Sequence, residues 1–544
     1  MAKKISPIIG ILKFSTREDA SRIYLKASCV IRLQGSSEPV DTGRISIDAG
    51  SRTDIADIRF RDRYGRKLPN GYSLNEMELS FSKSEAENFD IQNRLIVNYD
   101  GRYFGRILYS LFDLKKGRNK NSTIYIYNGM AMYFRQNRNN SLTFTVRDAN
   151  QYDYPEGQER LKKAYRAAMA ARKQRIGTGV KGRDRSEEPI LMYEKNCSRY
   201  EESASVLYEK LIDAGYSNVW YVVNEDNPAI AELPEKYRRN LVWKDSDRHL
   251  KLFFECDKFI SSETIDHALQ IRIASKLVQD KLTSRDLMYV FLQHGVMYMV
   301  SLNSEMRIGF RQKNCRLHKT VVSSELEAQH FIQLAGMKRE DLYITGLAKF
   351  DKCYRNESAD RIIIMPTWRR WETNQARDSL EETGYYRMIL RMFNAVPPQL
   401  REKVVILPHP LMKDRFRDSE TIGGHIMLAD SYDLVLRDCD LLITDYSSIA
   451  YDAFYRGANV IFCWEEKDEC MRHYGEETYL MLNEDNVFGD VCMSAEDLTA
   501  AVEKNYCRPQ NEDYVRRYRR IVEFNDGNNS GRIMECLKKD KVLQ

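Results

Sequence analysis

The pattern of hydrophobic and polar positions changes along the chain, near residue 150 and again near residue 189. Before the first change, apolar and polar residues alternate over short runs such as 21–27, 122–127 and 142–146, with turn sequences between them. Alternation of this kind is typical of strands that have one buried face. We therefore expect residues 1–155 to form an antiparallel β-sandwich domain.

The two segments that follow differ from the sandwich in composition. Residues 158–173 are rich in Ala and Arg and predict a basic helix, whereas residues 177–188 are Gly-rich and charged. The apolar face of the helix consists largely of alanines and is too thin for deep insertion into a membrane. We interpret residues 156–188 as a helix and linker that separate two domains.

From residue 189 onward, short continuous apolar runs alternate with helical patterns. Such runs are typical of strands buried on both faces of a parallel sheet. They predict an α/β fold with two Rossmann-like, doubly wound parallel-sheet domains that face a cleft, at residues 189–345 and 346–544. The expected strands are 189–193, 219–223, 257–260, 288–292, 320–322, 342–345, 362–365, 404–407, 441–443 and 460–462.

The stretch 440–454 changes from strand to helix at a turn that contains Thr444, Ser447 and Ser448. A helix start offers unpaired N–H groups, and small hydroxyl side chains add donors there, so the turn is suited to hold a phosphate. The alternative is that Ser447 or Ser448 only caps the helix. The residues that follow the neighbouring strands favour the phosphate interpretation.

Ligands of open parallel sheets bind at the carboxyl ends of the strands. In this chain, two of eight histidines, His294 and His409, directly follow predicted strands. Histidine can remove a proton from an alcohol or steady a phosphate, although each could also be structural. Arg369 and Arg370 follow another strand and could neutralise a diphosphate, or could form a surface salt bridge with Glu372.

Composition narrows the class of protein. The 544 residues are 43% hydrophobic, enough for two to four soluble domains, and contain no apolar run near the roughly 20 residues of a membrane span. The first residues do not resemble a secretory signal, so a cytoplasmic protein is expected. The glycine motifs of P-loop ATPases and of common NAD enzymes are absent from the sequence.

Charge is distributed unevenly. Residues 1–190 contain 35 Lys and Arg against 22 Asp and Glu, a net charge of +13, whereas the remaining residues contain 49 and 57, a net charge of −8. The basic third could face an anionic partner, such as a phospholipid surface or a polyanionic product. A basic face that is merely solvated explains the asymmetry equally well.

Metal and disulfide chemistry are not indicated. The eleven cysteines include no Cys-x-x-Cys pair, so reduced, mostly buried thiols are expected. Asp438 and Asp440 form an Asp-x-Asp sequence like that with which many sugar transferases hold a divalent cation. They precede the strand instead of following it, and we expect no metal site and no cofactor.

Taken in order, these motifs resemble the CDP-glycerol glycerophosphotransferase family, which includes the wall teichoic acid primases and polymerases. The resemblance covers about residues 189–535 and not the N-terminal sandwich. Its most specific part is the Thr-Asp-Tyr-Ser-Ser sequence after a buried strand. The segments that carry it are Gln293-His294-Gly295, Gly346 with Asp351, Pro366-Thr367-Trp368-Arg369, His409-Pro410, Thr444-Asp445-Tyr446-Ser447-Ser448 with Asp452, and Phe524-Asn525-Asp526-Gly527.

The resemblance implies a GT-B fold and a metal-independent transfer of a polyol phosphate from a CDP-polyol, CDP-glycerol or CDP-ribitol, to a hydroxyl of a lipid-linked acceptor. It places the protein on the inner face of the membrane. The roles that it implies are a general base for His294, stabilisation of the diphosphate for His409 and Arg369, phosphate binding for Thr444, Ser447 and Ser448, and donor, polyol or structural roles for Thr367, Lys349, Asp351 and Asp452.

The sequence departs from the family pattern at two motifs. Val296 stands where the family usually has Thr, which removes a hydroxyl near the expected base, and Lys349 replaces the usual arginine as the possible cation. The identity of the polyol, the acceptor, primase or polymerase activity and a homo-oligomeric state are therefore left open. No nucleic-acid partner is expected. The alternatives are a GT-B transferase that uses a nucleotide-sugar and a non-catalytic glycan-binding protein.

Overall fold

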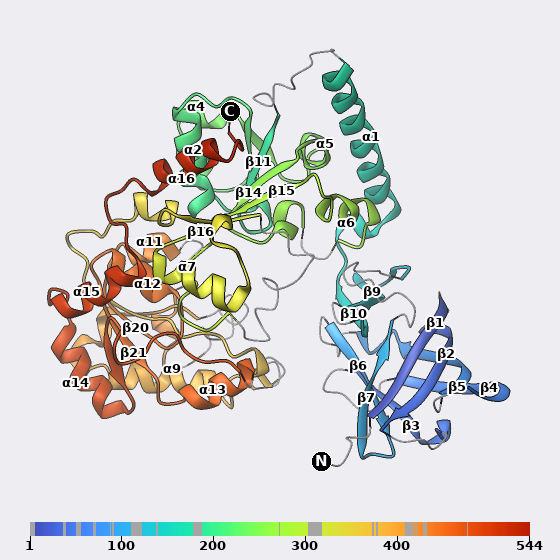
Figure 1. Cartoon of the computed structure of the whole chain (residues 1–544). Coiled ribbons are helices and arrows are strands. Elements are labelled where there is room, and N and C mark those ends of the chain that lie inside the picture. Colours follow the sequence, from blue (N-terminus) through green and yellow to red (C-terminus); the bar gives the residue numbers. More distant parts are fainter. Residues whose placement is uncertain are drawn as a thin grey trace. The chain divides into compact units, whose positions relative to one another are not determined.

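The protein divides into two compact units, which are described separately. Met1–Arg166 and Arg272–Ser284 form the first unit, and Ala167–Ile271 and Arg285–Gln544 form the second. The structure is a computed structural model (Figure 1). It describes residues 6–35, 40–49, 56–68, 72–86, 89, 92–109, 122–137, 140–177, 188–270, 273–302, 318–372, 375–376, 379–408, 416, 419, 421–427, 432–475 and 477–543.

The first unit contains an antiparallel sheet, as the alternating pattern predicts. Its strands follow one path, β4-β5-β2-β1-β7-β6-β10-β9-β8, with β3 paired to β6 and a single parallel pair between β1 and β7 among the described strands. The bounds are β1 Ser6–Glu18, β2 Arg22–Gln34, β3 Ile45–Ala49, β4 Ala56–Leu68, β5 Tyr72–Ser82, β6 Gln92–Tyr99, β7 Tyr103–Leu108, β8 Tyr125–Tyr127, β9 Met130–Gln136 and β10 Leu142–Asp148.

This sheet folds back over a single hydrophobic core. Four strands separate Phe81 of β5 from Phe144 of β10 in the path, yet their rings stack with centroids 4.2 Å apart. Both side chains are fully buried. The antiparallel N-terminal domain is thus confirmed, with one continuous bent sheet supplying both walls of its core.

The basic helix expected after the sheet is α1, Pro155–Gly177. Leu161, Ala164 and Ala168 are buried apolar residues of this helix, at the three- and four-residue spacing of one helix face. Most of the predicted linker that follows lies outside the described residues. No helix in the described part of the chain combines the length and the apolar character that crossing a bilayer requires.

The second unit begins with a seven-stranded parallel sheet in the order β13-β12-β11-β14-β15-β16-β17. Figure 1 shows α2, Ser203–Asp213, on one face of this sheet and α5, Asp247–Glu255, on the other. The strand bounds are β11 Ile190–Tyr193, β12 Val219–Val223, β13 Leu241–Trp243, β14 Lys258–Ser261, β15 Met288–Phe291, β16 Lys319–Val322 and β17 Leu342–Ile344.

A five-stranded parallel sheet follows, in the order β19-β18-β20-β21-β22. Its central strand is buried on both faces, because Leu442 joins the core beneath α12, Ile449–Tyr455, whereas Leu441 and Ile443 join the core beneath α9, Gly384–Ala395. The two predicted parallel sheets are confirmed. The strand bounds are β18 Arg361–Ile364, β19 Val404–Ile406, β20 Cys439–Thr444, β21 Asn459–Cys463 and β22 Asp490–Cys492.

The two parallel sheets share a continuous hydrophobic core. One cluster of buried side chains extends from Met192 of β11 to Leu442 of β20. The last helix, α16, Asn529–Lys539, packs against α2 of the first parallel sheet, and Lys258 of β14 donates to the carbonyl of Val542, 2.8 Å away. The two parallel sheets with their helices, called the first and the second lobe below, are therefore packed against each other.

Candidate functional site

The turns after β18 and β20 are locked together by buried hydrogen bonds. Asp445 Oδ1 accepts from the backbone N–H and from the hydroxyl of Thr367, both at 2.8 Å. Thr444 is fully buried, and its hydroxyl donates to the carbonyl of Met365 at 2.7 Å. Burial raises the pKa of Asp445, although the bonds from Thr367 partly oppose this. The hydroxyls of Thr367 and Thr444 thus hold the turns in place in this structure.

Ser447 and Ser448 lie at the start of α12 and are half-buried. Ser448 is the capping residue, but its side chain makes no capping hydrogen bond, and Ser447 Oγ accepts from the N–H of Ile449 over a long 3.4 Å. A strong capping bond would lie nearer 3.0 Å. Capping alone therefore explains these two hydroxyls poorly, and their phosphate-binding role stays a prediction.

The loop after β15 reaches this turn. A side-chain carbon at Gly295 would lie only 3.3 Å from Ser448 Oγ, so the His294 loop packs directly against the Ser447–Ser448 turn. Gln293 adopts a left-handed φ of 60°, and its buried amide donates to the carbonyl of Val321 at 2.6 Å. The side chain of His294 is exposed. Two motifs from different lobes are thereby brought together.

Lys349 joins the same two lobes. Its Nζ donates to the carbonyl of His294 at 2.7 Å and lies 2.5 Å from Asp452 Oδ1, on α12. The side chains of Lys349 and Asp452 are 13% and 8% exposed. Burial acts to lower the pKa of Lys349, but the carboxylates of Asp452 and Glu202 outweigh it and raise that pKa. Lys349 is therefore a buried cation with fixed partners.

Arg369 is buried and already paired. Its guanidinium forms ion pairs with Glu466 and with Glu372, the latter at 3.5 Å. The predicted contact with Glu372 is therefore present, but inside the protein and not at its surface. A donor diphosphate could bind Arg369 only by displacing or sharing these carboxylates. The side chain of Arg370 lies outside the described residues.

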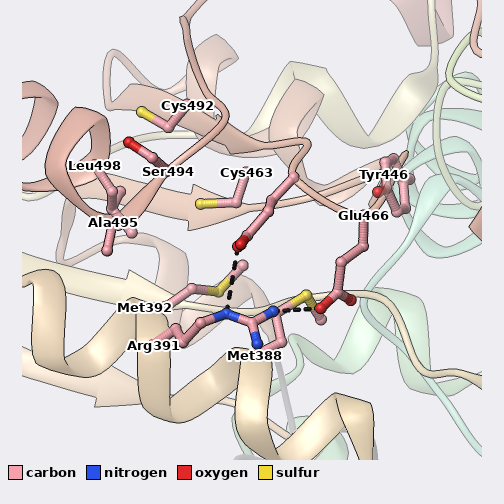
Figure 2. A pocket seen from close by; sticks show the side chains of 11 residues that line it. Met388, Arg391, Met392, Tyr446, Cys463, Glu466, Cys492, Ser494, Ala495 and Leu498 are labelled. Carbon is pink, nitrogen blue, oxygen red and sulfur yellow. Dashed lines mark hydrogen bonds and ion pairs between the residues drawn. The ribbon is translucent and has the colours of Figure 1, made fainter. Parts of the chain in front are cut away.

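A cavity of about 60 Å³ lies beside this ion pair, between α9 and the carboxyl ends of β21 and β22. Figure 2 shows Arg391 and Glu466 in it, joined by an ion pair. Nε of Arg391 also lies 3.3 Å from Glu465. Tyr446, which belongs to the Thr444–Ser448 turn, also lines this cavity. The lining residues are Met388, Arg391, Met392, Tyr446, Cys463, Glu465, Glu466, Cys492, Ser494, Ala495 and Leu498.

Asp351 has a structural position. Its two carboxylate oxygens accept from the backbone N–H groups of Asn529 and Ser530, each at 2.7 Å, at the start of α16. Gly346 has a positive φ of 79° and lies so close to Asn529 that a side-chain carbon would meet its amide at 2.4 Å. Gly346 and Asp351 therefore anchor the start of the C-terminal helix.

Two acids at the end of β11 and the start of α2 were not singled out by the sequence analysis. Glu194 directly follows β11 and accepts the N–H groups of Glu201, Glu202 and Ser205 at the start of α2. Glu202 Oε2 has no hydrogen-bond partner among the described residues, and burial, together with Glu194, raises the pKa of Glu202 well above its usual range. Glu194 directly follows a predicted strand, so the rule that ligands bind at the carboxyl ends of parallel strands could have found it.

Glu263 and His267 form a second group that the sequence analysis did not single out. Their carboxylate oxygen and ring nitrogen lie 3.8 Å apart, after β14. Burial raises the pKa of Glu263 to about 7. Burial, together with the charges of Lys195 and His294, lowers the pKa of His267 to about 4. Glu263 follows its strand by two residues, so the same rule could have found it.

The remaining sequence candidates lie elsewhere or cannot be placed. His409 is outside the described residues. Asp440 pairs with Arg355 at 2.7 Å and accepts from the N–H of Cys507 at the opposite, amino end of β20. Among the described residues, no three His, Cys, Asp or Glu side chains gather closely enough to hold a metal ion.

Comparisons with known proteins complete this description. Residues 182–539 match the family described as CDP-Glycerol:Poly(glycerophosphate) glycerophosphotransferase. The minor teichoic acid biosynthesis protein GgaB of Bacillus subtilis (strain 168) is 22% identical over 502 residues, which are 86% of this chain and 52% of that protein. This chain thus spans about half the length of that curated relative.

Two solved structures resemble the chain more distantly. The wall teichoic acid polymerase TagF is 16% identical, with a TM-score of 0.48 over 72% of this chain and 100% of its own. CalG4, the calicheamicin glycosyltransferase, is 11% identical, with a TM-score of 0.35 over 65% of this chain and 99% of its own.

Proposed function

Since the chain belongs to the CDP-glycerol:poly(glycerophosphate) glycerophosphotransferase family, we propose that it transfers a polyol phosphate from a CDP-polyol to a hydroxyl group and releases CMP. Glycerol phosphate is the foremost candidate for the group transferred. The acceptor would be a lipid-linked saccharide or a growing polyol-phosphate polymer of the cell wall. The observation that carries the proposal is the packing of the His294 loop against the Ser447–Ser448 turn.

The reaction that fits this arrangement is an in-line displacement at the β-phosphorus. The acceptor oxygen forms a bond to this phosphorus while the bond to the bridging oxygen of CMP breaks, and CMP leaves with the electron pair. His294 would take the proton of the acceptor hydroxyl, because its side chain is exposed next to the turn. Phosphoryl transfer depends mainly on positioning and on neutralising charge, so no covalent intermediate is needed.

Donor binding would use the Ser447–Ser448 turn. The hydroxyls of Ser447 and Ser448 and the N–H groups at the start of α12 offer donors for the diphosphate. Arg369 would contribute only if the phosphate competes with Glu466 for its guanidinium. For His409 the proposal rests on the family resemblance alone.

We expect the acceptor to bring the protein to the inner face of the cell membrane. The support is the basic N-terminal third, in which exposed residues of α1 such as Lys162, Lys163 and Arg166 carry positive charge. If anionic lipid attracts this region, sedimentation with anionic vesicles should fall as salt is raised. Binding that is insensitive to salt would remove this part of the proposal.

A panel of donors assayed for CMP tests the proposal. We expect CMP release with CDP-glycerol or CDP-ribitol and an acceptor, unchanged by a metal chelator. A GT-B transferase that uses a nucleotide-sugar would release a nucleoside diphosphate instead. A glycan-binding protein would release nothing with any donor.

A further inference from the structure

Lys349 is held by groups from both lobes of the proposed site. Its Nζ contacts the carbonyl of His294 at 2.7 Å and the carboxylate of Asp452 at 2.5 Å, and the side chains of Lys349 and Asp452 are only 13% and 8% exposed. Burying a charge is unfavourable unless it is paired, so this lysine cannot easily leave Asp452. The contact to His294 goes to the peptide group and leaves the imidazole exposed.

The backbone around His294 needs support. Gln293 before it has a left-handed φ of 60°, which is unfavourable for a residue with a side chain and persists only where the surroundings hold it. Gly295 after it lies so close to Ser448 that an added side-chain carbon would be 3.3 Å from Oγ, a tight contact. Between these two restraints, the carbonyl of His294 is fixed by Lys349, and the direction of the imidazole depends on that peptide.

We propose that Lys349 is a positioning residue, which fixes the peptide of His294 to Asp452 of α12 and so sets the distance between the imidazole and the Ser447–Ser448 turn. This inference rests on the proposed function, because it gives Lys349 a task in that transfer. Of the donor, polyol or structural roles expected for Lys349, it selects a structural role. A lysine that bound the donor would have to abandon the buried carboxylate of Asp452.

Kinetics of Lys349→Met separate the two roles. Loss of positioning should lower kcat by roughly 10- to 100-fold, because small misplacements of a catalytic group have effects of this size. The KM for the CDP-donor should stay within about twofold, since uniform binding is not removed. Lys349→Arg keeps the charge and should restore part of kcat.

Lys352 provides a matched control. It lies on the same 3-10 helix, Ala348–Lys352, and also reaches the first lobe, where its Nζ lies 2.5 Å from Glu209. The Lys352 side chain is 53% exposed and contacts neither His294 nor Asp452. Lys352→Met should therefore leave kcat and KM unchanged. Thermal unfolding of each variant shows whether it is folded.

A double variant gives the decisive readout. If Lys349 acts through His294, then adding Lys349→Met to His294→Ala should lower the residual kcat no further, because the two effects are not additive. If Lys349→Met does not fold, Asp452→Asn, which removes the charged partner of Lys349, should show the same change in kcat without a change in KM.

Three outcomes would overturn the inference. A donor KM raised tenfold, a further loss in the double variant, or normal kcat in Lys349→Met would each show that Lys349 does not position His294. These results leave the proposed function intact as long as the unmodified protein releases CMP. Absence of CMP release from the unmodified protein would remove the proposed function, and the inference with it.

Discussion

Charged side chains meet in two different settings in this protein, on the N-terminal sheet and at the carboxyl ends of the parallel strands. On the sheet, Arg59, Glu78 and Lys26 lie side by side in one row across β4, β5 and β2, open to solvent. At the strand ends, Lys349 and Asp452 are buried and join two lobes. Exposed ion pairs contribute little to stability because water and salt screen them. Breaking a buried pair leaves a charge without its partner, so buried pairs hold their two side chains in fixed positions.

This difference shows that the net charge of a region does not by itself indicate an anionic partner. The N-terminal third is strongly basic, yet in this row acids alternate with bases, and Arg17 contacts Glu78 at 3.6 Å with both side chains at least one third exposed. A solvated face accounts for such a row. Contact with an anionic membrane therefore stays a prediction, whereas the buried pairs direct attention to the His294 loop.

The largest effect is expected from the imidazole itself. His294→Ala should lower the rate of CMP release by roughly 10²- to 10⁴-fold, the usual contribution of a general base. The side chain is exposed, so the melting temperature should not change. Wild-type activity in this variant would exclude His294 from the mechanism.

The buried carboxylate of Asp445 should matter most for stability. Asp445→Ala leaves the N–H and hydroxyl of Thr367 without their acceptor and should lower the free energy of unfolding by about 3 kcal/mol. Thr367→Val removes only the hydroxyl and should lower it by about 1 kcal/mol. Equal effects of the two substitutions, measured by denaturant unfolding, would contradict the assignment of this bond network.

Glu263 and His267 should give opposite pH dependences. The folded pKa of His267, about 4, lies below its ordinary 6.5, so the unfolded chain binds more protons and stability is lost as pH falls through this window. The folded pKa of Glu263, about 7, lies above 4.5, so the folded chain binds more protons and stability is lost as pH rises.

Single substitutions separate these two contributions. Relative to the unmodified protein, Glu263→Gln should gain stability between pH 4.5 and 7 as pH rises, and His267→Gln should gain it as pH falls from 6.5 to 4. Each slope is at most about 1.4 kcal/mol per pH unit. Parallel slopes for the two variants in unfolding curves would show that the two groups are not buried as the structure has them.

The close approach of the two loops can be tested at a glycine. Gly295→Ala places a carbon 3.3 Å from Ser448 Oγ, and this crowding should reduce kcat about tenfold by shifting the loop. Gly424→Ala is the matched control, because a side-chain carbon there meets nothing within 4 Å. If both variants retain full activity, the loop and the turn do not need this separation.

Substitutions in the exposed row of charges on the N-terminal sheet should have the smallest effect on stability. Lys26→Ala removes a solvent-exposed charge opposite Glu78 and should change the free energy of unfolding by less than about 0.5 kcal/mol. A decrease in the free energy of unfolding as large as that of Asp445→Ala would contradict the expected difference between exposed and buried charges.

Much of the architecture could be predicted because it depends on local patterns. Continuous apolar runs such as 441–443 identify strands buried on both faces, and alternation identifies the N-terminal sheet. The rule that ligands bind at the carboxyl ends of parallel strands groups His294 with Ser448 from the sequence alone. The same rule, applied to β11 and β14, would also have found Glu194 and Glu263.

Other features depend on contacts between distant residues. The ion pair of Arg369 with Glu466 joins residues 97 positions apart, so the sequence showed only the nearer partner, Glu372. The buried pairing of Lys349 with Asp452 is likewise invisible in a linear pattern. Local periodicity also does not specify which strands of the N-terminal sheet become neighbours, and its bent path follows from packing around Phe81 and Phe144.

The structure of the protein with CDP-glycerol bound would test the central claim most directly. The diphosphate should contact the Ser447–Ser448 turn, with the β-phosphorus facing the imidazole of His294. A donor found away from this turn, with His294 pointing elsewhere, would contradict the assignment of the site.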